Sequence, residues 1–336
     1  MADIFPSAAG STPVDVPGVA APEILGYADI LDAHGRLFGG SGTAVRQTPI
    51  MKLPGSALGV DCAEVWFKLE QLQIGGSFKA RGMFNRLLSA SVPAAAVMSA
   101  SGGNAGIACA VAAASIGVPC TVFVSNVSPM AKRRKLEALG ASVVVAGDNY
   151  PEALQASRSR AAETGAMLVH SYDQVEVVAG AGTLALEIEA QAGLPDAVLV
   201  SVGGGGLIGG LAAGFASRSR VVALEPELCP TLHAARQVGH PVDVDVGGIA
   251  ADSLGARRIG AIAWEITQRH VDSAFLLSEQ AIAEAQAWMW NDLRLAVEPA
   301  AALPLAALRS GVYRPRSDER VCLIVCGANV DPAALG

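Results

Sequence analysis

The stretch Ser201-Val202-Gly203-Gly204-Gly205-Gly206-Leu207 decides the fold, because it joins a strand pattern directly to a helix pattern. An apolar run over 197–202 leads into it, and helical spacing over 207–217 follows it. A second stretch, Ser101-Gly102-Gly103-Asn104-Ala105-Gly106, likewise follows an apolar run and opens a helical pattern. In an open parallel sheet, both turns lie at the carboxyl edge of the strands, where ligands bind.

The rest of the chain repeats this alternation of strand and helix patterns. Apolar runs bounded by turn residues predict strands at 64–69, 96–100, 120–124, 142–146, 197–202, 221–225 and 321–326. Helical spacing predicts helices at 78–90, 104–116, 130–139, 151–164, 178–192, 207–217, 255–268, 279–291 and 300–310. The alternation predicts an α/β fold with a mostly parallel, twisted sheet covered by helices. Residues 1–22, rich in Ala, Pro, Gly and Ser, are expected to form a mobile arm.

The composition indicates a well-buried protein that binds neither nucleic acid nor membrane. Hydrophobic residues make up 51% of the 336 and charged residues 16%, and the net charge is −7. The one pronounced basic run, 132–135, has no second basic or aromatic stripe beside it, so we expect a solvated helix face. No apolar run reaches the roughly 18 residues of a membrane span, and the first residues do not form a secretory signal. Six cysteines without a CxxC pair and five histidines without ligand spacing indicate a cytoplasmic protein without zinc.

The four glycines at 203–206 predict a phosphate cup, since glycine lets the backbone and a helix N-terminus approach an anion. They also allow a rival interpretation. Gly204, Gly206 and Gly209 match GxGxxG, and Glu225 lies about where a ribose-binding acid would follow. The chain could therefore be an NAD(P)-binding oxidoreductase, although four consecutive glycines exceed what a dinucleotide turn needs. A turn used only for packing is the third alternative.

Lys79 is the candidate reactive amine. It follows Gly75-Gly76 and opens a helix, and it is one of only five lysines in the chain. A helix N-terminus and the nearby Arg81 would both disfavour the protonated ammonium, as a Schiff-base lysine requires. By position alone, a surface lysine is the commoner interpretation.

Three motifs together resemble a known family. Gly75-Gly76-Ser77-Phe78-Lys79-Ala80-Arg81-Gly82 resembles the Schiff-base segment of fold-type II pyridoxal-phosphate (PLP) enzymes, the tryptophan synthase β-subunit-like fold. The stretch at 101–106 resembles their asparagine loop and the one at 201–207 their phosphate loop, in the same order. The resemblance runs from about residue 44 to the end. It implies two open, twisted, mostly parallel sheets, with a large domain (23–91 and 173–336), a small domain (92–172) and a homodimer.

The resemblance implies a role for each matching residue. Lys79 would hold the cofactor and later remove the Cα proton, Phe78 would pack on the ring, and Asn104 would bind the cofactor's 3′-oxygen. The phosphate would lie against the loop Gly203, Gly204, Gly205, Gly206 and Leu207. The substrate carboxylate would lie against Ser101, Gly102, Gly103, Asn104 and Ala105.

Within the family, the asparagine loop is most similar to that of single-domain L-serine dehydratases, of the serine/threonine ammonia-lyase group. Gly102 stands where racemases use a proton-donating serine, and Phe78-Lys79-Ala80 stands where cysteine synthases have Val-Lys-Asp. The segments 251–255 and 297–300 also resemble dehydratases. The resemblance therefore implies loss of water and then ammonia from a small β-hydroxy amino acid, with racemisation and β-replacement as alternatives. We expect no added regulatory domain, and a non-catalytic PLP-binding protein also stays open.

Two further positions carry expectations from the resemblance. Cys326 ends the strand pattern at 321–326, at the position that faces the pyridine nitrogen; a neutral thiol there would leave the ring a weaker electron sink, which suits elimination. Glu225, Cys229 and Thr231 match a cation site of the family. Because Thr231 offers only a neutral oxygen, a monovalent ion such as K⁺ fits this site better than a divalent one. A buried inert cysteine and an ordinary strand-end loop are the plainer alternatives.

Overall fold

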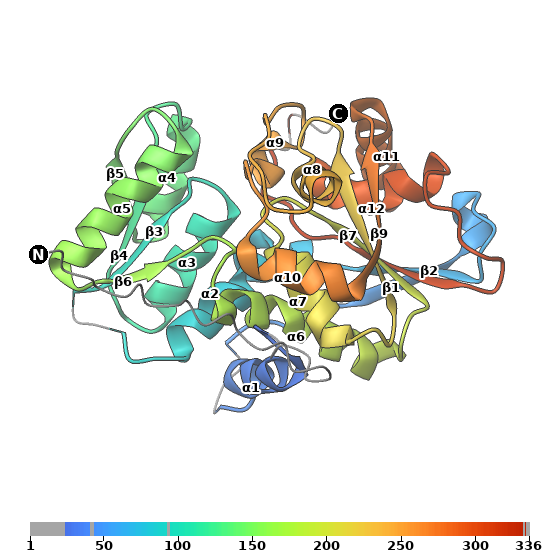
Figure 1. The fold of residues 1–336 in the computed structure, drawn as a ribbon, viewed down its shortest axis with the longest axis horizontal. Coiled ribbons are helices and arrows are strands. Elements are labelled where there is room, and N and C mark those ends of the chain that lie inside the picture. Colours follow the sequence, from blue (N-terminus) through green and yellow to red (C-terminus); the bar gives the residue numbers. More distant parts are fainter. Residues whose placement is uncertain (1–23, 41–43, 93–94, 332, 334–336) are drawn as a thin grey trace, which may run out of the picture.

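The computed structural model describes residues 24–40, 44–92, 95–331 and 333, and shows two sheets side by side (Figure 1). The predicted arm at 1–22 lies outside the described residues. The fold class expected from the sequence is confirmed, because both sheets are dominated by parallel strands and covered by helices.

The larger sheet has six strands in the order β1-β2-β10-β7-β8-β9. Only the edge strand β1 runs antiparallel to its neighbour, and the remaining pairs are parallel. The strands are β1 (Ile50–Pro54), β2 (Glu64–Lys68), β7 (Ala197–Ser201), β8 (Arg220–Pro226), β9 (Val271–Leu277) and β10 (Arg320–Ile324). The central strands β7 and β10 are almost entirely buried, as expected where helices cover both faces.

The smaller sheet has four parallel strands in the order β5-β4-β3-β6. They are β3 (Val97–Ala100), β4 (Cys120–Val124), β5 (Ser142–Val145) and β6 (Met167–Val169). We propose that residues 92–172, which contain this sheet, form the small domain, and that 23–91 and 173–336 form the large domain.

The helices lie against the faces of the two sheets. In Figure 1, α3, α4 and α5 surround the smaller sheet, α6, α7 and α10 lie on one side of the larger sheet, and α11 and α12 lie on the other. Their bounds are α1 (Tyr27–Phe38), α2 (Lys79–Leu88), α3 (Asn104–Ser115), α4 (Met130–Ala138), α5 (Tyr150–Thr164), α6 (Val175–Ala192), α7 (Gly206–Phe215), α8 (Thr231–Val238), α9 (Ala251–Leu254), α10 (Ala261–His270), α11 (Glu279–Leu293) and α12 (Pro299–Arg309). Short 3-10 turns occur at Gly55–Leu58, Glu70–Leu72 and Ile74–Gly76.

The main departure from the predicted elements is at α10. The sequence pattern begins this helix at 255, but it begins at Ala261, because Gly260 is its N-cap and the Asp173 carboxylate accepts from the amides of Ala261 and Ile262, each at 3.1 Å. The strands β1, β6 and β9 and the helices α1, α8 and α9 carry no sequence prediction.

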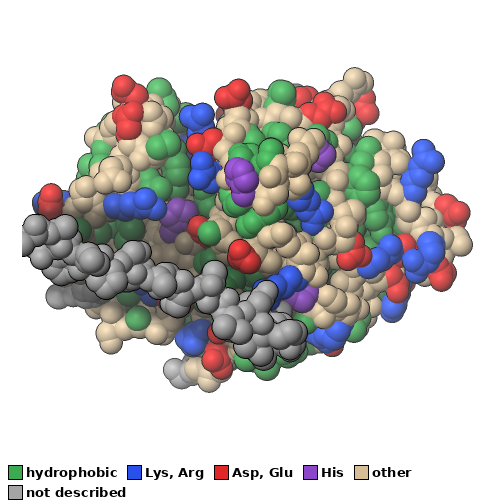
Figure 2. All heavy atoms as spheres, viewed as in Figure 1, with side chains coloured by type: hydrophobic (Ala, Val, Ile, Leu, Met, Phe, Trp, Pro, Cys, Tyr) green, Lys and Arg blue, Asp and Glu red, His purple; other side chains and the backbone are tan. Residues whose placement is uncertain are grey.

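The basic run at 132–135 is a partly solvated helix face, since Lys132 and Arg133 are half-buried and Arg134 and Lys135 are exposed. On the face in Figure 2, acidic and basic side chains are interspersed instead of being gathered into one basic stripe. Among the described residues, no helix is long and apolar enough to cross a bilayer.

Candidate active site

Lys79 lies at the start of α2 with its amine directed at the smaller sheet's side of the cleft. Its Nζ donates a hydrogen bond to the Ser171 carbonyl at 2.7 Å and lies 5.1 Å from the centre of the Phe78 ring. Burial lowers the pKa of Lys79 from 10.5 to about 8, while the acidic groups of Cys326 and Glu298 act in the opposite direction. About a tenth of this amine is therefore neutral at pH 7, far more than for a lysine of ordinary pKa, and the neutral form is the nucleophile.

Arg81 does not lower the pKa of Lys79 as expected, because its guanidinium is held by two carboxylates elsewhere. Arg81 is fully buried and forms ion pairs at 2.8 Å with both Glu70 and Glu187. Lys68 pairs with Glu187 at 2.6 Å, so two cations and two carboxylates form a buried neutral group. This group fixes α2 against β2 and α6, and burial of the amine itself explains the lowered pKa of Lys79.

The glycine loop after β7 leaves no room for side chains. A Cβ on Gly203 would lie 3.0 Å from the Leu254 backbone, and one on Gly204 would lie 2.4 Å from the Tyr172 ring. Gly205 has φ +88 and would place a Cβ 2.5 Å from that of Ala263. The loop ends at the first turn of α7, whose leading N–H groups have no acceptor within the helix. It is therefore a closed cradle of backbone donors, suited to a phosphate group.

The asparagine loop after β3 is held by the carboxylate of Glu298, which belongs to none of the three motifs. Asn104 donates from Nδ2 to both oxygens of Glu298 at 2.9 Å, and its Oδ1 accepts from Asn329 at 2.6 Å. The backbone N–H of Asn329 donates to Glu298 at 2.7 Å. Burial raises the pKa of Glu298, while the hydrogen bond from Asn104 opposes that shift. Glu298 belongs to the segment 297–300 that resembles dehydratases, and that resemblance is the signal for this acid in the sequence.

Cys326 lies at the base of the site, just beyond the end of β10. Its carbonyl accepts from the Phe78 amide at 3.0 Å, which ties this strand end to the residue before Lys79. Burial raises the pKa of its thiol well above the usual value, so the group is neutral at physiological pH.

These residues surround two adjoining spaces. A small cavity of about 50 Å³ is lined by Phe78, Lys79, Asn104, the glycine loop and Cys326. It opens into a cleft of about 360 Å³ lined by Ser101 and the rest of the asparagine loop. Lys79, Asn104, Tyr172 and Gly204 border both spaces. The structure thus brings together every predicted cofactor and substrate residue from four separate parts of the chain.

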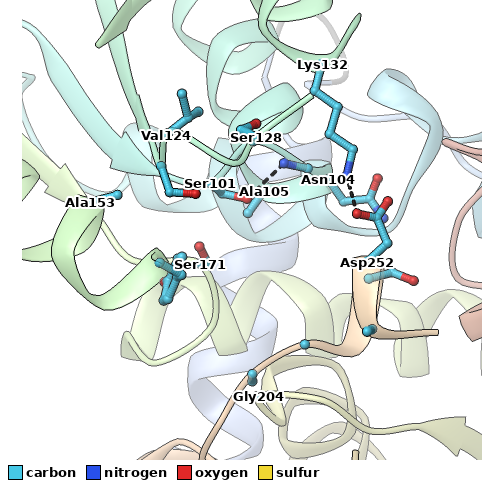
Figure 3. A pocket seen from close by; sticks show the side chains of 18 of the residues that line it. Ser101, Asn104, Ala105, Val124, Ser128, Lys132, Ala153, Ser171, Gly204 and Asp252 are labelled. Carbon is cyan, nitrogen blue, oxygen red and sulfur yellow. Dashed lines mark hydrogen bonds and ion pairs between the residues drawn. The ribbon is translucent and has the colours of Figure 1, made fainter. Parts of the chain in front are cut away.

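Figure 3 shows the cleft from close by. Ser101, Asn104 and Ser128 lie on one side of it, and Ser171 and Gly204 lie on the other. Lys132 of α4 and Asp252 of α9 form an ion pair across its mouth. Four further residues line the cleft but belong to none of the three motifs: Ser128, Lys132, Tyr172 and Asp252. Asp252 lies in the dehydratase-like segment 251–255, whereas nothing in the sequence marks the other three for the site.

The site fits PLP on its own geometry. Any side chain at the glycine positions would fill the cradle, so the space is kept for a ligand. The Lys79 amine beside it has a lowered pKa, and Phe78 offers an apolar ring face. Lys79, the loop 203–207, Asn104 and Cys326 would hold the group.

The predicted cation residues are only partly brought together. The Glu225 carboxylate accepts from the amides of Leu232 at 2.7 Å and His233 at 2.8 Å, and from Thr231 Oγ1 at 3.1 Å. The Cys229 thiol instead donates to the Gly247 carbonyl at 3.2 Å. Burial raises the pKa of Glu225 to about 7. Within the described part of the chain, no group of three or more His, Cys, Asp or Glu side chains could hold a metal ion.

The same contacts weaken the dinucleotide alternative. Glu225, its ribose-binding acid, is fully buried and committed to the first turn of α8. It is not available to a ribose hydroxyl.

Comparison with known proteins agrees with this site. The sequence model of the family described as "Pyridoxal-phosphate dependent enzyme" matches residues 42–327. The chain is 34% identical to a phenylserine dehydratase of Ralstonia pickettii, over 86% of this chain and 90% of that protein. It is 36% identical to an L-threonine ammonia-lyase of Geobacter sulfurreducens, over 80% of this chain and 67% of that protein. The structure of maize serine racemase superposes with a TM-score of 0.85 at 28% identity, over 93% of this chain and 95% of that one.

Proposed function

The chain belongs to the pyridoxal-phosphate-dependent enzyme family, and we propose that it eliminates water and then ammonia from a small β-hydroxy amino acid, such as L-serine or L-threonine, to give a 2-oxo acid. The observation that carries the proposal is the placement of Lys79 between the glycine cradle and the asparagine loop. The dehydratase and ammonia-lyase relatives support the same reaction class.

The cofactor supplies an electron sink for the bonds at Cα when it is bound. The chain's own residues do the positioning. The loop 203–206 would hold the phosphate through backbone N–H groups, Phe78 would pack on the ring, and Asn104 would bind beside it. Cys326, a neutral thiol at the base of the site, carries no negative charge that could stabilise a protonated ring nitrogen, so the bound group would be a weaker electron sink, which would favour elimination over reactions that need a long-lived carbanion.

Lys79 moves the proton. Its amine, with a pKa lowered to about 8, accepts the Cα proton of the substrate at Nζ. Ser101 and the amides of 102–105 hold the substrate carboxylate, so that the Cα–H bond is oriented toward Nζ. Cleavage of the Cα–H and Cβ–O bonds releases water, and hydrolysis of the enamine product releases ammonia.

Gly102 disfavours racemisation by the asparagine loop itself, because this residue has no side chain that could return a proton to Cα. The resemblance to a racemase structure at 28% identity leaves racemisation as a measurable side activity. β-Replacement is tested by adding a thiol or sulfide to the assay and looking for a new amino acid.

An assay of 2-oxo acid and ammonia with serine, threonine, threo-3-hydroxyaspartate and 3-phenylserine tests the proposal. We expect stoichiometric release of both products with at least one of these amino acids, and complete loss in Lys79→Ala. Oxo-acid formation that persists in Lys79→Ala contradicts the assignment, and turnover that depends on NADH supports the oxidoreductase alternative.

The remaining expectations also belong to the proposal. We propose a monovalent cation such as K⁺ beside Glu225 and Thr231, because a buried carboxylate with a raised pKa is stabilised by a nearby positive charge. The homodimer and the cytoplasmic location stay predictions. Gel filtration with light scattering tests the first, and fractionation of the source cells tests the second.

A further inference from the structure

The hydroxyl of Ser128 fills the space where a side chain on Gly102 would lie. A Cβ built on Gly102 would be only 2.8 Å from Ser128 Oγ. Its next neighbours, Val124 Cγ1 at 3.6 Å and Ser128 Cβ at 3.9 Å, are at ordinary contact distances. The asparagine loop therefore lacks a hydroxyl of its own at 102, and the segment between β4 and α4 supplies one from outside.

Ser128 is built to present this hydroxyl. Its amide donates to the Ser125 carbonyl at 3.1 Å, which fixes the turn, and the residue is half-buried in the wall of the cleft. Figure 3 shows it on the same side of the pocket as Ser101 and Asn104. Among the described residues, Ser128 Oγ has no hydrogen-bond partner. Because Ser128 lines the cleft, this hydroxyl is free to bind a ligand there.

The surroundings favour an anionic ligand. Ser101 Oγ and the leading N–H groups of α3 lie in the same loop, and all of them can donate hydrogen bonds. The two carboxylates nearby already have partners, because Asp252 pairs with Lys132 and Glu298 accepts from Asn104. A corner rich in donors, whose two carboxylates already have partners, suits a carboxylate ligand.

We propose that Ser128 Oγ donates a hydrogen bond to the carboxylate of the amino-acid substrate, and is a substrate-positioning residue from outside the three motifs. This assignment rests on the proposed function. Ser128 acts in binding the substrate, whereas Lys79 acts on the proton.

The test is a relocation of the hydroxyl in the cofactor-loaded enzyme. Ser128→Ala removes the hydroxyl, and the double variant Gly102→Ser/Ser128→Ala moves it to the loop. The double variant has room, since the only close neighbour of a Cβ at 102 is the oxygen that alanine removes. Gly102→Ser alone should be impaired by that clash.

For Ser128→Ala we expect KM for the best substrate to rise about tenfold or more, since a hydrogen bond to a charged group is lost. The kcat should stay within about twofold, because such a contact is made equally in the ground and transition states. The double variant should recover most of the lost kcat/KM. A substrate amide, which lacks the carboxylate charge, should show a much smaller penalty in Ser128→Ala.

Three results would overturn the assignment. They are an unchanged KM in Ser128→Ala, a fall in kcat at constant KM, or formation of the D-amino acid by the wild type that is lost in Ser128→Ala. The last two would indicate proton transfer instead of carboxylate binding. An active wild type with an unaffected variant refutes only the role of Ser128, whereas a wild type that releases no oxo acid refutes the proposed function and this role with it.

Discussion

The two glycine-bearing turns look alike in sequence but differ in how tightly they are packed. The turn after β7 is closed, since a side chain at Gly203, Gly204 or Gly205 would meet neighbours at 2.4–3.0 Å. The turn after β3 is open at two of its three glycines. Among the described residues, a Cβ on Gly103 would have the Asp252 carbonyl at 3.8 Å, and one on Gly102 would meet the movable Ser128 hydroxyl at 2.8 Å, whereas one on Gly106, where α3 begins, would lie 1.9 Å from the Ser101 carbonyl.

This difference matches two kinds of ligand. A cofactor phosphate stays in place, so a rigid cradle that excludes side chains and water suits it. A substrate enters and leaves in each cycle, so its loop needs space and adjustable side chains such as Ser101 and Ser128. The comparison predicts that small changes at the closed turn are severe, and that the same change at Gly103, the most open position of the turn after β3, is mild.

Gly205→Ala should have the largest effect. The residue has φ +88, and a methyl group there would overlap Ala263 and Ile259. Backbone strain and overpacking together should lower the free energy of unfolding by about 2–5 kcal/mol and abolish cofactor retention. Urea denaturation and the cofactor content after dialysis measure both. Wild-type stability with bound cofactor would show that the turn is not a closed cradle.

The rate at which cofactor-free enzyme captures PLP should depend on pH through Lys79. With a pKa lowered to about 8, the neutral fraction of the amine falls about tenfold for each pH unit below 8. Above about pH 9, nearly all of the amine is neutral. The capture rate, followed by visible absorbance, should therefore rise up to about pH 8 and then level. A rate that is still rising tenfold per unit at pH 9–10 would indicate an ordinary, solvated lysine.

K⁺ should stabilise the protein through Glu225 and Thr231, which lie behind the closed turn. Thr231 Oγ1 donates to the Gly203 carbonyl at 2.6 Å and lies 3.1 Å from Glu225 Oε1, so it links this acid to the cradle. Burial raises the pKa of Glu225 from 4.5 to about 7, so without a cation the folded state keeps its proton longer than the unfolded state, and stability falls as pH rises from about 4.5 to 7.

K⁺ binds the carboxylate form, so it should raise the melting temperature at pH 8 and have little effect at pH 5. At about ten times its dissociation constant, K⁺ should contribute about 1.4 kcal/mol. A bulky tetraalkylammonium ion is the matched control, and Glu225→Gln should remove the response. Equal stabilisation at both pH values, or in the Gln variant, would argue against a cation at this acid.

Gly103→Ala should have the smallest effect and is the matched control for Gly205→Ala. Its φ of −105 is accessible to alanine and its surroundings are open. We expect a change of about 0.5 kcal/mol or less in unfolding free energy and full cofactor content. A loss as large as that of Gly205→Ala would remove the distinction between the two turns.

The sequence predicted what is local, and missed what depends on packing between distant segments. The strands next to the two turns, and the helices that follow them, were correct because apolar runs ending in glycine are a strong signal. β6 was missed because it has only three residues, and β9 because its burial pattern mixes exposed and buried positions.

The site divides in the same way. Lys79, Asn104 and the glycines were identified by motif, whereas Glu298, Tyr172 and Ser128 reach the site from other elements. Arg81 shows the limit of inference from proximity in sequence: two positions from Lys79, its side chain points into a buried ion-pair group instead. A helix places neighbouring residues on different faces, so closeness along the chain does not give closeness of charge.

The account depends most on a covalent bond between Lys79 and the cofactor. Reduction of the purified, cofactor-loaded protein with borohydride would make this bond permanent, and mass spectrometry of its peptides would locate it. We predict one added pyridoxyl phosphate group per chain, on the peptide containing Lys79. A modified Lys52, Lys68, Lys132 or Lys135 in its place, or no modified lysine in a protein that still releases oxo acid, would contradict it.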